Sequence, residues 1–320
     1  MPSDRFWTHA WPFSHTLCIV TLFLVSVITF LVFQILPGDP ALVILGVDAD
    51  PVQIEALQRT MHVDEPVVER YVSWVGSALH GNLGISFRYQ KPVSGIIADC
   101  FSVTALLALF TLVLTILIGL PIGIWLAKHD KAKYIVPFSL VSQLGVSIPS
   151  FCMGILLISI FTVKLRWFPS LGFTPWSQNP LACIKGLFLP SFSLSLGTSA
   201  VLIRYLRVSI ISEQKLDYVR TARSKGLDEN TVLQRHVLRN SLIPVITIFG
   251  MLVADVLGGS IIIENVFSLP GIGKLIATSI ATRDLPLIQG LVMYLACIVV
   301  VCNASVDLLY SLIDPRIRLL

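Results

Sequence analysis

Six long stretches of this sequence contain almost no charged residue, and they constrain its fold more than any other feature. They span residues 17–36, 101–127, 134–163, 186–203, 241–263 and 285–306. The apolar core of a bilayer, about 30 Å thick, is crossed by roughly 20 apolar residues of α-helix. Lipid cannot hydrogen-bond the backbone, so such segments are helical. The sequence therefore predicts an all-α membrane protein with six transmembrane helices.

The composition agrees with this prediction. Of the 320 residues, 55% are hydrophobic and only 13% are charged, whereas a soluble domain carries about 25% charged residues. This balance excludes an ordinary soluble enzyme and a disordered chain. Six cysteines are too few for a disulfide scaffold. Cys100 and Cys183 are both expected near the outer face, and whether they pair is left open.

The distribution of Lys and Arg predicts the orientation. These residues are concentrated in the connections 128–133 and 204–240, and positive residues favour the cytoplasmic side. Both termini are then cytoplasmic, and the segments 37–100, 164–185 and 264–284 lie outside. The first apolar run is too long for a signal peptide, and no cleavage pattern follows it, so we expect an uncleaved helix. Topology explains the net charge of +4, and no nucleic-acid partner is expected.

The outer segment 37–100 carries two helix signals. Asp50 followed by Pro51 predicts a helix that runs to about His62. Asp64 is expected to open a second helix, with Tyr71 and Trp74 on its apolar side. His62 and His80 have no helical register with each other, so we predict plain surface histidines and no metal site.

The connection 204–240 is more structured than a simple tether. Leu216, Val219 and Ala222 recur at helical spacing and form a narrow apolar stripe. Ser212 is a candidate cap at the start of this helix. Gly226 is placed to end it in a left-handed conformation, and Asp228 is placed to cap a second helix. Such a pair suits docking onto another protein, or binding of anionic lipid headgroups as an amphipathic pair.

Several strings resemble one family. Arg220-Thr-Ala222, with Gly226 four residues later, resembles the "EAA" loop of ABC importer permeases. The longer string through Leu227, followed by His236-Val-Leu-Arg-Asn-Ser-Leu-Ile-Pro244, looks like the dipeptide/oligopeptide/nickel branch. Four further strings of this branch occur in the expected order: Leu36-Pro-Gly-Asp-Pro-Ala41, Gly81-Asn-Leu-Gly84, Glu264-Asn-Val-Phe-Ser-Leu-Pro-Gly-Ile-Gly273 and Asp314-Pro-Arg316. Arg220 replaces the leading Glu of the general pattern, as is typical of this branch.

The resemblance implies a type I ABC importer permease fold and a set of partners. These are a second homologous permease subunit, two ATP-binding cassette ATPase subunits, an extracytoplasmic substrate-binding protein and membrane lipid. The outer segment 37–100 would meet the binding protein or pack on neighbouring helices. The ATPase-coupling segment would comprise Leu216, Asp217, Tyr218, Val219, Arg220, Thr221, Ala222, Arg223, Ser224, Lys225, Gly226 and Leu227. Within it, we expect Leu216, Tyr218, Val219 and Ala222 to dock hydrophobically on the ATPase.

Catalytic motifs are absent from the sequence. Gly271-Ile-Gly-Lys274 is the nearest approach to a P-loop, and it lacks the first Gly and the hydroxyl residue. We therefore expect no enzyme activity and no cofactor on this chain, and ATP hydrolysis on partner subunits. An ion-gradient-driven secondary transporter or channel is the alternative, and a membrane scaffold is a third class. Few intramembrane charges argue against the secondary transporter.

Asp255 is the one acidic residue inside an apolar run. A carboxylate at this depth usually faces a partner or an aqueous cavity. It is a candidate for the translocation path, and a hydrogen bond between helices or at a permease dimer interface is the structural alternative. The predicted organisation is 1–36 for the N-terminus and first helix, 37–100 for the outer segment, and 101–320 for a five-helix core with the coupling loop at 204–240. Dipeptides, oligopeptides and nickel or other metal chelates all remain open as substrates.

Overall fold

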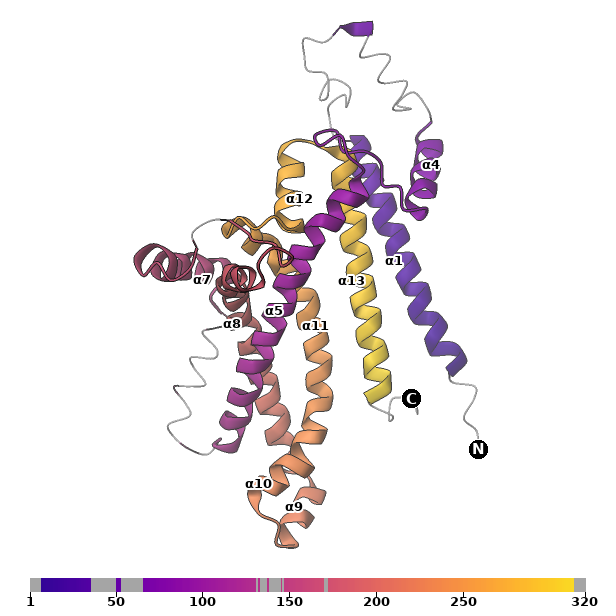
Figure 1. Ribbon diagram of the computed structural model, residues 1–320. Coiled ribbons are helices and arrows are strands. Elements are labelled where there is room, and N and C mark those ends of the chain that lie inside the picture. The colour runs from indigo at the N-terminus through magenta and orange to yellow at the C-terminus, as the bar shows by residue number, and fades with distance from the viewer. Residues whose placement is uncertain are drawn as a thin grey trace. The chain divides into compact units, whose positions relative to one another are not determined.

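The computed structural model describes residues 7–35, 50–52, 66–130, 147–169 and 172–313, together with residues 132, 137 and 145; side chains are not described for 7–17, 33–35 and 306–313. The described secondary structure is helical apart from an isolated bridge between Ile85 and Pro92 (Figure 1). The chain divides into two compact units. The first comprises Met1–Ser102 and Gly271–Ala304, and the second Val103–Pro270 and Ser305–Leu320.

Four helices among the described residues are long and apolar enough to cross a membrane. They are Val93–Lys128, Pro180–Glu213, Glu229–Val266 and Leu285–Ser305. Three shorter apolar helices accompany them: Cys18–Val32, Ser150–Lys164 and Ile272–Ala281. The architecture is therefore that of an all-α membrane protein.

The second unit is built around α5 (Val93–Lys128), α8 (Pro180–Glu213) and α11 (Leu238–Val266), with α7 (Ser150–Leu157) and the π-helix η1 (Ile158–Lys164) beside them. Helix α8 starts cleanly because Pro180 is its first residue and the Asn179 side chain accepts from the Ala182 N–H at 3.1 Å. α5 and α8 approach closely through Gly119 and Gly123. A Cβ at Gly119 would lie 2.6 Å from Leu202 Cδ2, so the small residues allow this packing.

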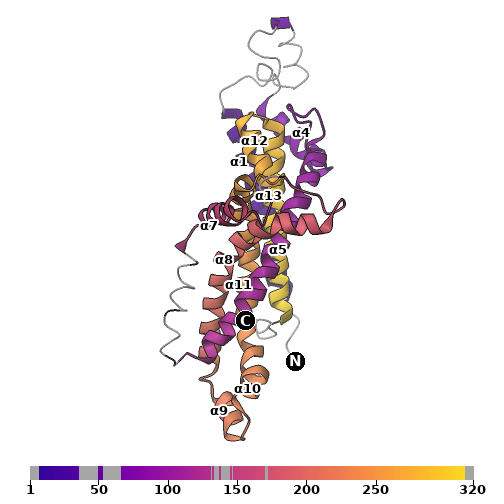
Figure 2. The same ribbon diagram turned by 60° about the vertical axis from the view of Figure 1, so that its left-hand side comes forward.

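The same unit also contains a helical hairpin, residues 216–237, which connects the end of α8 to the start of α11. It consists of α9 (Asp217–Ser224), α10 (Glu229–Thr231) and the π-helix η2 (Val232–Val237). Figures 1 and 2 both place α9 and α10 together beyond the ends of α8 and α11. The hairpin therefore continues the helical core of this unit.

The first unit contains α1 (Trp7–Ile35), α4 (Val67–Leu79), α12 (Ile272–Ala281), the first turns of α5, and α13 (Leu285–Ile313) as far as Ala304. α1 packs on α4 through the rings of Phe30, Tyr71 and Trp74. The Tyr71 hydroxyl also hydrogen-bonds Ser26 at 2.8 Å. As expected, Tyr71 and Trp74 lie on the packed side of α4.

Asp284 ties the turn before α5 to the start of α13. Its carboxylate is only 1% exposed and accepts from the Ser86 hydroxyl at 2.5 Å and from the backbone N–H groups of Phe87 and Arg88 at 3.1 Å. A buried carboxylate needs such partners. The turn at residues 86–88, which follows the string 81–84, and the end of the segment 264–284 are thus joined in the first unit.

The structure corrects several predicted boundaries. α8 continues through Ser212 to Glu213, so Ser212 lies inside α8 and does not cap α9, whose N-cap is Leu216. The segment 264–284, expected as a loop, contains the helix α12. α4 begins at Val67 after Pro66, and Asp64 is not its cap. Propensity alone does not reveal these boundaries because tertiary packing extends helices past their most apolar stretch.

Other predictions fall partly or wholly outside the described residues. These are the strings 36–41 and 314–316, the helix expected to reach His62, and the first half of the run 134–163. Near them, the Val52 N–H donates to the Asp50 side chain at 3.0 Å, as a capping residue does. Cys183 is buried in a cluster of the second unit with Val103 and Leu107, and Cys100 packs against a cluster of the first unit that includes Val93 and Ile97.

Candidate functional site

The predicted coupling segment forms the first helix of the hairpin. α9 ends at Ser224, and Gly226 follows with φ +81°, the left-handed conformation expected for it. The Gly226 N–H bonds the Arg223 carbonyl at 2.9 Å. The next helix starts at Asp228, whose carboxylate accepts from the Thr231 N–H at 3.1 Å, so both predicted helix-end roles are confirmed.

The Asp228 cap depends on pH. The hydrogen bonds from Thr231 hold the pKa of the Asp228 carboxyl below its ordinary value of 3.8. A carboxyl with a lowered pKa in the folded state stabilises that state above its unfolded pKa, and the contribution fades as the pH falls through the folded value. The cap is therefore fully formed at neutral pH.

The apolar side of α9 packs inward on its own chain. Val219 is fully buried and Ala222 is 5% exposed, in one cluster with Leu206, Ile210 and Val237. The expectation that Val219 and Ala222 dock on a partner is therefore wrong, because no partner can reach them. Sequence spacing correctly placed Val219 and Ala222 on one face, but Leu216, the third residue of the predicted stripe, is the N-cap of α9 and is 46% exposed. The spacing also could not show that η2 and α8 cover the two buried residues.

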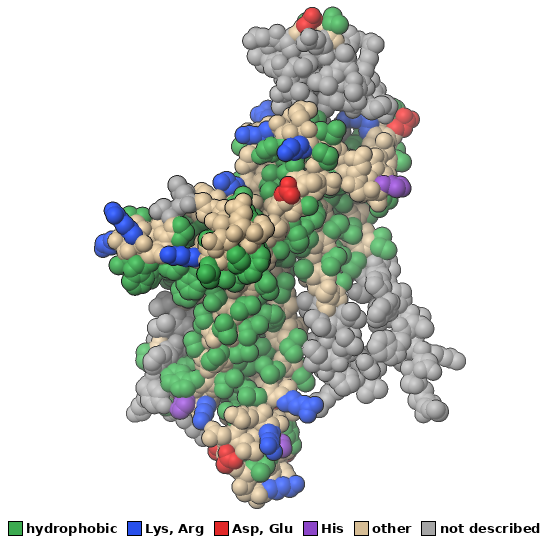
Figure 3. Space-filling model, in the orientation of Figure 1, with side chains coloured by type: hydrophobic (Ala, Val, Ile, Leu, Met, Phe, Trp, Pro, Cys, Tyr) green, Lys and Arg blue, Asp and Glu red, His purple; other side chains and the backbone are tan. Residues whose placement is uncertain are grey.

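The other members of the predicted segment are exposed. Leu216 and Tyr218 keep 46% and 38% of their surface accessible. Arg220 lies 3.5 Å from Asp217, and both side chains are largely in solvent. Arg223 forms a two-pronged pair with Glu229, with N···O distances of 2.8 and 3.2 Å. Figure 3 shows the charged side chains gathered on the hairpin, below a broad apolar surface.

Tyr218 connects three parts of the site. Its hydroxyl lies 2.5 Å from Glu213 Oε1 at the end of α8 and 3.2 Å from the His236 carbonyl in η2. The Asn240 amide, in the first turn of α11, donates to the same oxygen at 3.0 Å. The sequence does not predict a role for Glu213 or Asn240. Their only local signal is their position at the helix ends that flank the predicted coupling segment.

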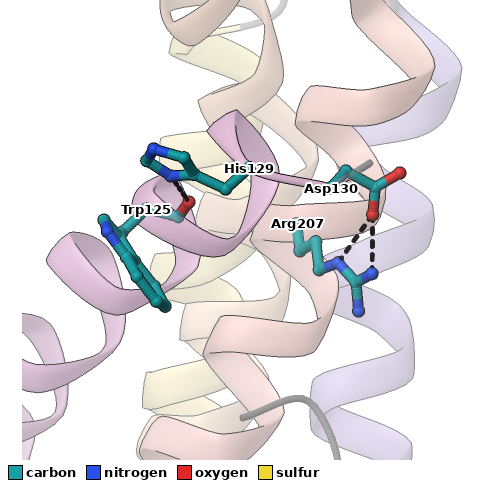
Figure 4. Close-up of polar contacts among 4 residues, drawn as sticks. All are labelled: Trp125, His129, Asp130 and Arg207. Atoms are coloured by element: carbon teal, nitrogen blue, oxygen red, sulfur yellow. Dashed lines mark hydrogen bonds and ion pairs between the residues drawn. The ribbon is translucent and has the colours of Figure 1, made fainter. Parts of the chain in front are cut away.

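The end of α5 is fastened to this region by two contacts. The Lys128 ammonium donates to Asn230 Oδ1 in α10 at 2.8 Å. Arg207 on α8 donates to Asp130 Oδ1 from Nε at 3.2 Å and from a terminal nitrogen at 2.6 Å. Figure 4 shows this pair beside His129, whose ring bonds the Trp125 carbonyl at 2.9 Å. The hairpin is thus held by α5 as well as by α8 and α11.

A groove opens between α8 and α11 just above the hairpin. Its volume is about 530 Å³, and its lining consists of Tyr205, Val208, Ser209, Ser212, Glu213, Pro244, Val245, Thr247 and Ile248. Glu213 is shared between this groove and the Tyr218 contacts. The walls of the groove are therefore connected directly to α9.

Asp255 lies on an exposed face of α11. Met251 and Ile262, on the same face, are 61% and 51% exposed, and Gly258 meets no other side chain there. Asp255 makes no hydrogen bond or ion pair with a residue that the structure describes, so the expected bond between helices is not seen there. α11 runs unbroken past Gly258 and Gly259. A buried acid that sequence reasoning left without a role, Glu264, accepts from Thr104 at 2.6 Å.

The fold and this site define a class of protein, the membrane-spanning subunit of an ABC importer. The structure resembles that of the MetNI methionine ABC transporter in an inward-facing conformation, with a TM-score of 0.58 at 14% identity over 68% of this chain and 96% of that chain. Residues 119–319 match the family model "Binding-protein-dependent transport system inner membrane component", and residues 14–108 match the N-terminal model of the same systems. The chain belongs to this family.

Full-length relatives support the assignment. A peptide transport system permease protein of Brucella abortus (strain 2308) is 39% identical over 300 residues, which cover 94% of this chain and 96% of that protein. The glutathione transport system permease protein GsiC of Escherichia coli (strain K12) is 36% identical over 301 residues, or 94% and 95% of the two chains. The chain is thus a multi-pass inner-membrane permease component, not an enzyme, and its system includes ATPase and binding-protein partners.

Proposed function

We propose that this chain forms one half of the translocation path of a peptide importer and couples it to ATP hydrolysis through the hairpin. The observation that carries the proposal is the division of α9 into two faces. One face is buried in the chain's own core through Val219 and Ala222, and the other presents exposed polar and charged side chains. A helix held in this way can transmit a displacement by a bound partner subunit to the helical core of this chain.

The rest of the arrangement follows from this proposal. The chain crosses the membrane six times, with both termini and the hairpin in the cytoplasm and the segment 37–100 outside. Its core spans 101–320, with the coupling loop at 204–240. Two ATPase subunits bind below, one on this hairpin and one on that of a second, homologous permease subunit. An extracytoplasmic binding protein delivers the substrate, lipid surrounds the helices, and no nucleic acid is involved.

The exposed face of α11 is the proposed wall of the path or the contact with the second permease subunit. It places one carboxylate, Asp255, on a surface that includes Met251 and Ile262. Exposed charge inside a membrane helix is stable next to water or a partner. Both positions are consistent with the absence of a described partner for Asp255 in this chain.

Peptides are the proposed substrate class. The two relatives described above are named for peptide and glutathione transport, and glutathione is itself a small peptide. In the described residues no group of three or more His, Cys, Asp or Glu could hold a metal ion, and nickel and other metal chelates stay the alternative substrate class. A secondary transporter would not need the ATPase that this family employs.

Charge reversal on the exposed face of α9 tests the proposal. In the purified importer, Arg220→Glu should lower the amount of ATPase that co-purifies by about ten-fold or more, because reversal of the charge replaces an attraction across the proposed interface with a repulsion. Uptake of labelled di- and tripeptides into vesicles should fall with it. Arg88→Glu, a matched reversal on the exposed turn before α5 in the other unit, should leave the amount of co-purified ATPase unchanged. Normal ATPase retention by Arg220→Glu would refute docking on this face.

A further inference from the structure

The phenol of Tyr218 sits where three helical elements meet. It comes from α9, its hydroxyl lies 2.5 Å from Glu213 Oε1 on α8, and Asn240 on α11 donates to it at 3.0 Å. The carbonyl of His236 in η2 lies 3.2 Å from the same oxygen. A phenol has one proton to donate and can accept as well. Its proton therefore goes to Glu213 or to His236, while Asn240 donates in either case.

These two acceptors belong to different helices. The Glu213 carboxylate is the stronger one because it is charged, and it is also the closer of the two. His236 leads directly into α11, since η2 and α11 are continuous. The hydroxyl can keep its contacts on both sides only while the ends of α8 and α11 hold their present spacing.

The packing of α9 does not depend on this hydroxyl. Val219 and Ala222 already anchor the helix in the core, and the Tyr218 side chain itself stays 38% exposed. The contacts of the hydroxyl instead reach the two helices that line the groove of about 530 Å³, and Glu213 is part of that lining. A change in the width of the groove would therefore change the hydrogen bonding of Tyr218. Loss of those hydrogen bonds would likewise change the width of the groove.

We propose that Tyr218 is a positioning residue, a latch that links the orientation of α9 to the separation of α8 and α11. This inference rests on the proposed function of the hairpin. Movement of α9 under a docked ATPase pulls on α8 through Glu213 and on α11 through Asn240, so that the groove opens and closes with the ATPase cycle. Coupling of this kind is reciprocal between the two sites.

The test uses the complete importer in vesicles, with both permease subunits, the ATPases and the binding protein. Tyr218→Phe removes one oxygen and keeps the ring. We expect the number of peptides transported per ATP hydrolysed to fall about five-fold or more, because hydrogen bonds to charged groups are the stronger kind. Stimulation of ATP hydrolysis by the loaded binding protein should fall in parallel, while the ATPase subunits remain bound. An unchanged transport ratio overturns the latch.

A matched control and a second variant separate a latch from a merely structural contact. Tyr71→Phe loses a hydroxyl that bonds Ser26 at 2.8 Å in the other unit, and it should leave the ratio unchanged. Glu213→Gln keeps an acceptor oxygen and should retain most of the coupling, whereas Glu213→Ala should lose it. Tyr218→Phe combined with Glu213→Ala should be no worse than either alone. Additive losses, or loss of the ATPase from Tyr218→Phe, overturn the proposal.

The proposed function and the latch fail in different ways. If the wild-type importer shows no ATP-dependent peptide uptake and binds no ATPase, the proposed function is wrong. If the wild type couples normally and Tyr218→Phe does too, only the latch is wrong.

Discussion

At the scale of single residues, Gly226 decides how the hairpin turns. Its φ of +81° lies in the left-handed region, and a Cβ placed there would meet no neighbouring atom within 4 Å. The requirement for Gly is therefore one of backbone conformation and not of space. Left-handed backbone costs an ordinary L-residue about 1–2 kcal/mol, while Asn tolerates it better than other side chains.

Substitution at this glycine gives a graded prediction. Gly226→Ala should lower the stability of the hairpin by about 1 kcal/mol, and Gly226→Asn should lower it less. Hydrogen exchange of the amides in α9 would measure the difference, since local opening reports local stability. Equal exchange in Gly226→Ala and the wild type would show that the left-handed turn does not limit this hairpin.

At the scale of elements, the contact between α5 and α8 depends on two small residues. A Cβ at Gly119 would approach Leu202 Cδ2 to 2.6 Å, and one at Gly123 would approach Leu206 Cδ2 to 2.9 Å. Leu202 and Leu206 belong to the cluster that also holds Val219 and Ala222. Crowding of α5 against α8 would therefore disturb the packing that supports α9.

Glycine substitutions on two helices make a matched comparison. Gly119→Val should destabilise the protein by about 1–3 kcal/mol, the usual cost of overpacking. Gly76→Ala, at a helical position of α4 with open space around it, should be neutral or stabilising by about 0.5–1 kcal/mol because Ala favours helix. Thermal unfolding in detergent measures both. A stable Gly119→Val protein would mean that α5 and α8 are not in tight contact.

The sequence predicts the elements of the site better than their surroundings. Local signals are sufficient for Gly226 and Asp228, because a helix end is defined by its own few residues. The buried side of α9 is different, since the same stripe of Val219 and Ala222 fits either a partner's surface or the chain's own core. Likewise, α12 escapes prediction because its apolar face is short and it directly follows Pro270 and Gly271. Contacts between distant segments, such as Tyr218 with Asn240, leave no local pattern.

At the scale of the whole molecule, the sidedness of the membrane is the property to test. The positive-inside rule assigns the hairpin to the cytoplasm and the connection before α8 to the outside. Exposed serines lie in both places, Ser224 at the end of α9 and Ser177 in the turn before α8.

Cysteine labelling at these two positions gives a direct answer. In a cysteine-free background and intact spheroplasts, Ser177→Cys should react with a membrane-impermeant maleimide, and Ser224→Cys should react only after permeabilisation. The reverse labelling pattern would place the hairpin outside the cell, where a cytoplasmic ATPase could not bind it. Cys183, which is buried, should be protected in the wild-type chain.

The continuity of the helix from Glu229 to Val266 has a mechanical consequence. Its 38 residues make a rod of about 57 Å at 1.5 Å per residue. Two features soften it, the π-helical turns of η2 and Pro244. Both lie in the half of this helix nearest Gly226, so we expect the remainder, which includes Asp255, to move as one stiff segment. The part beyond Pro244 is about 33 Å long at 1.5 Å per residue, so a tilt of about 5° at the pivot would displace its far end by about 3 Å.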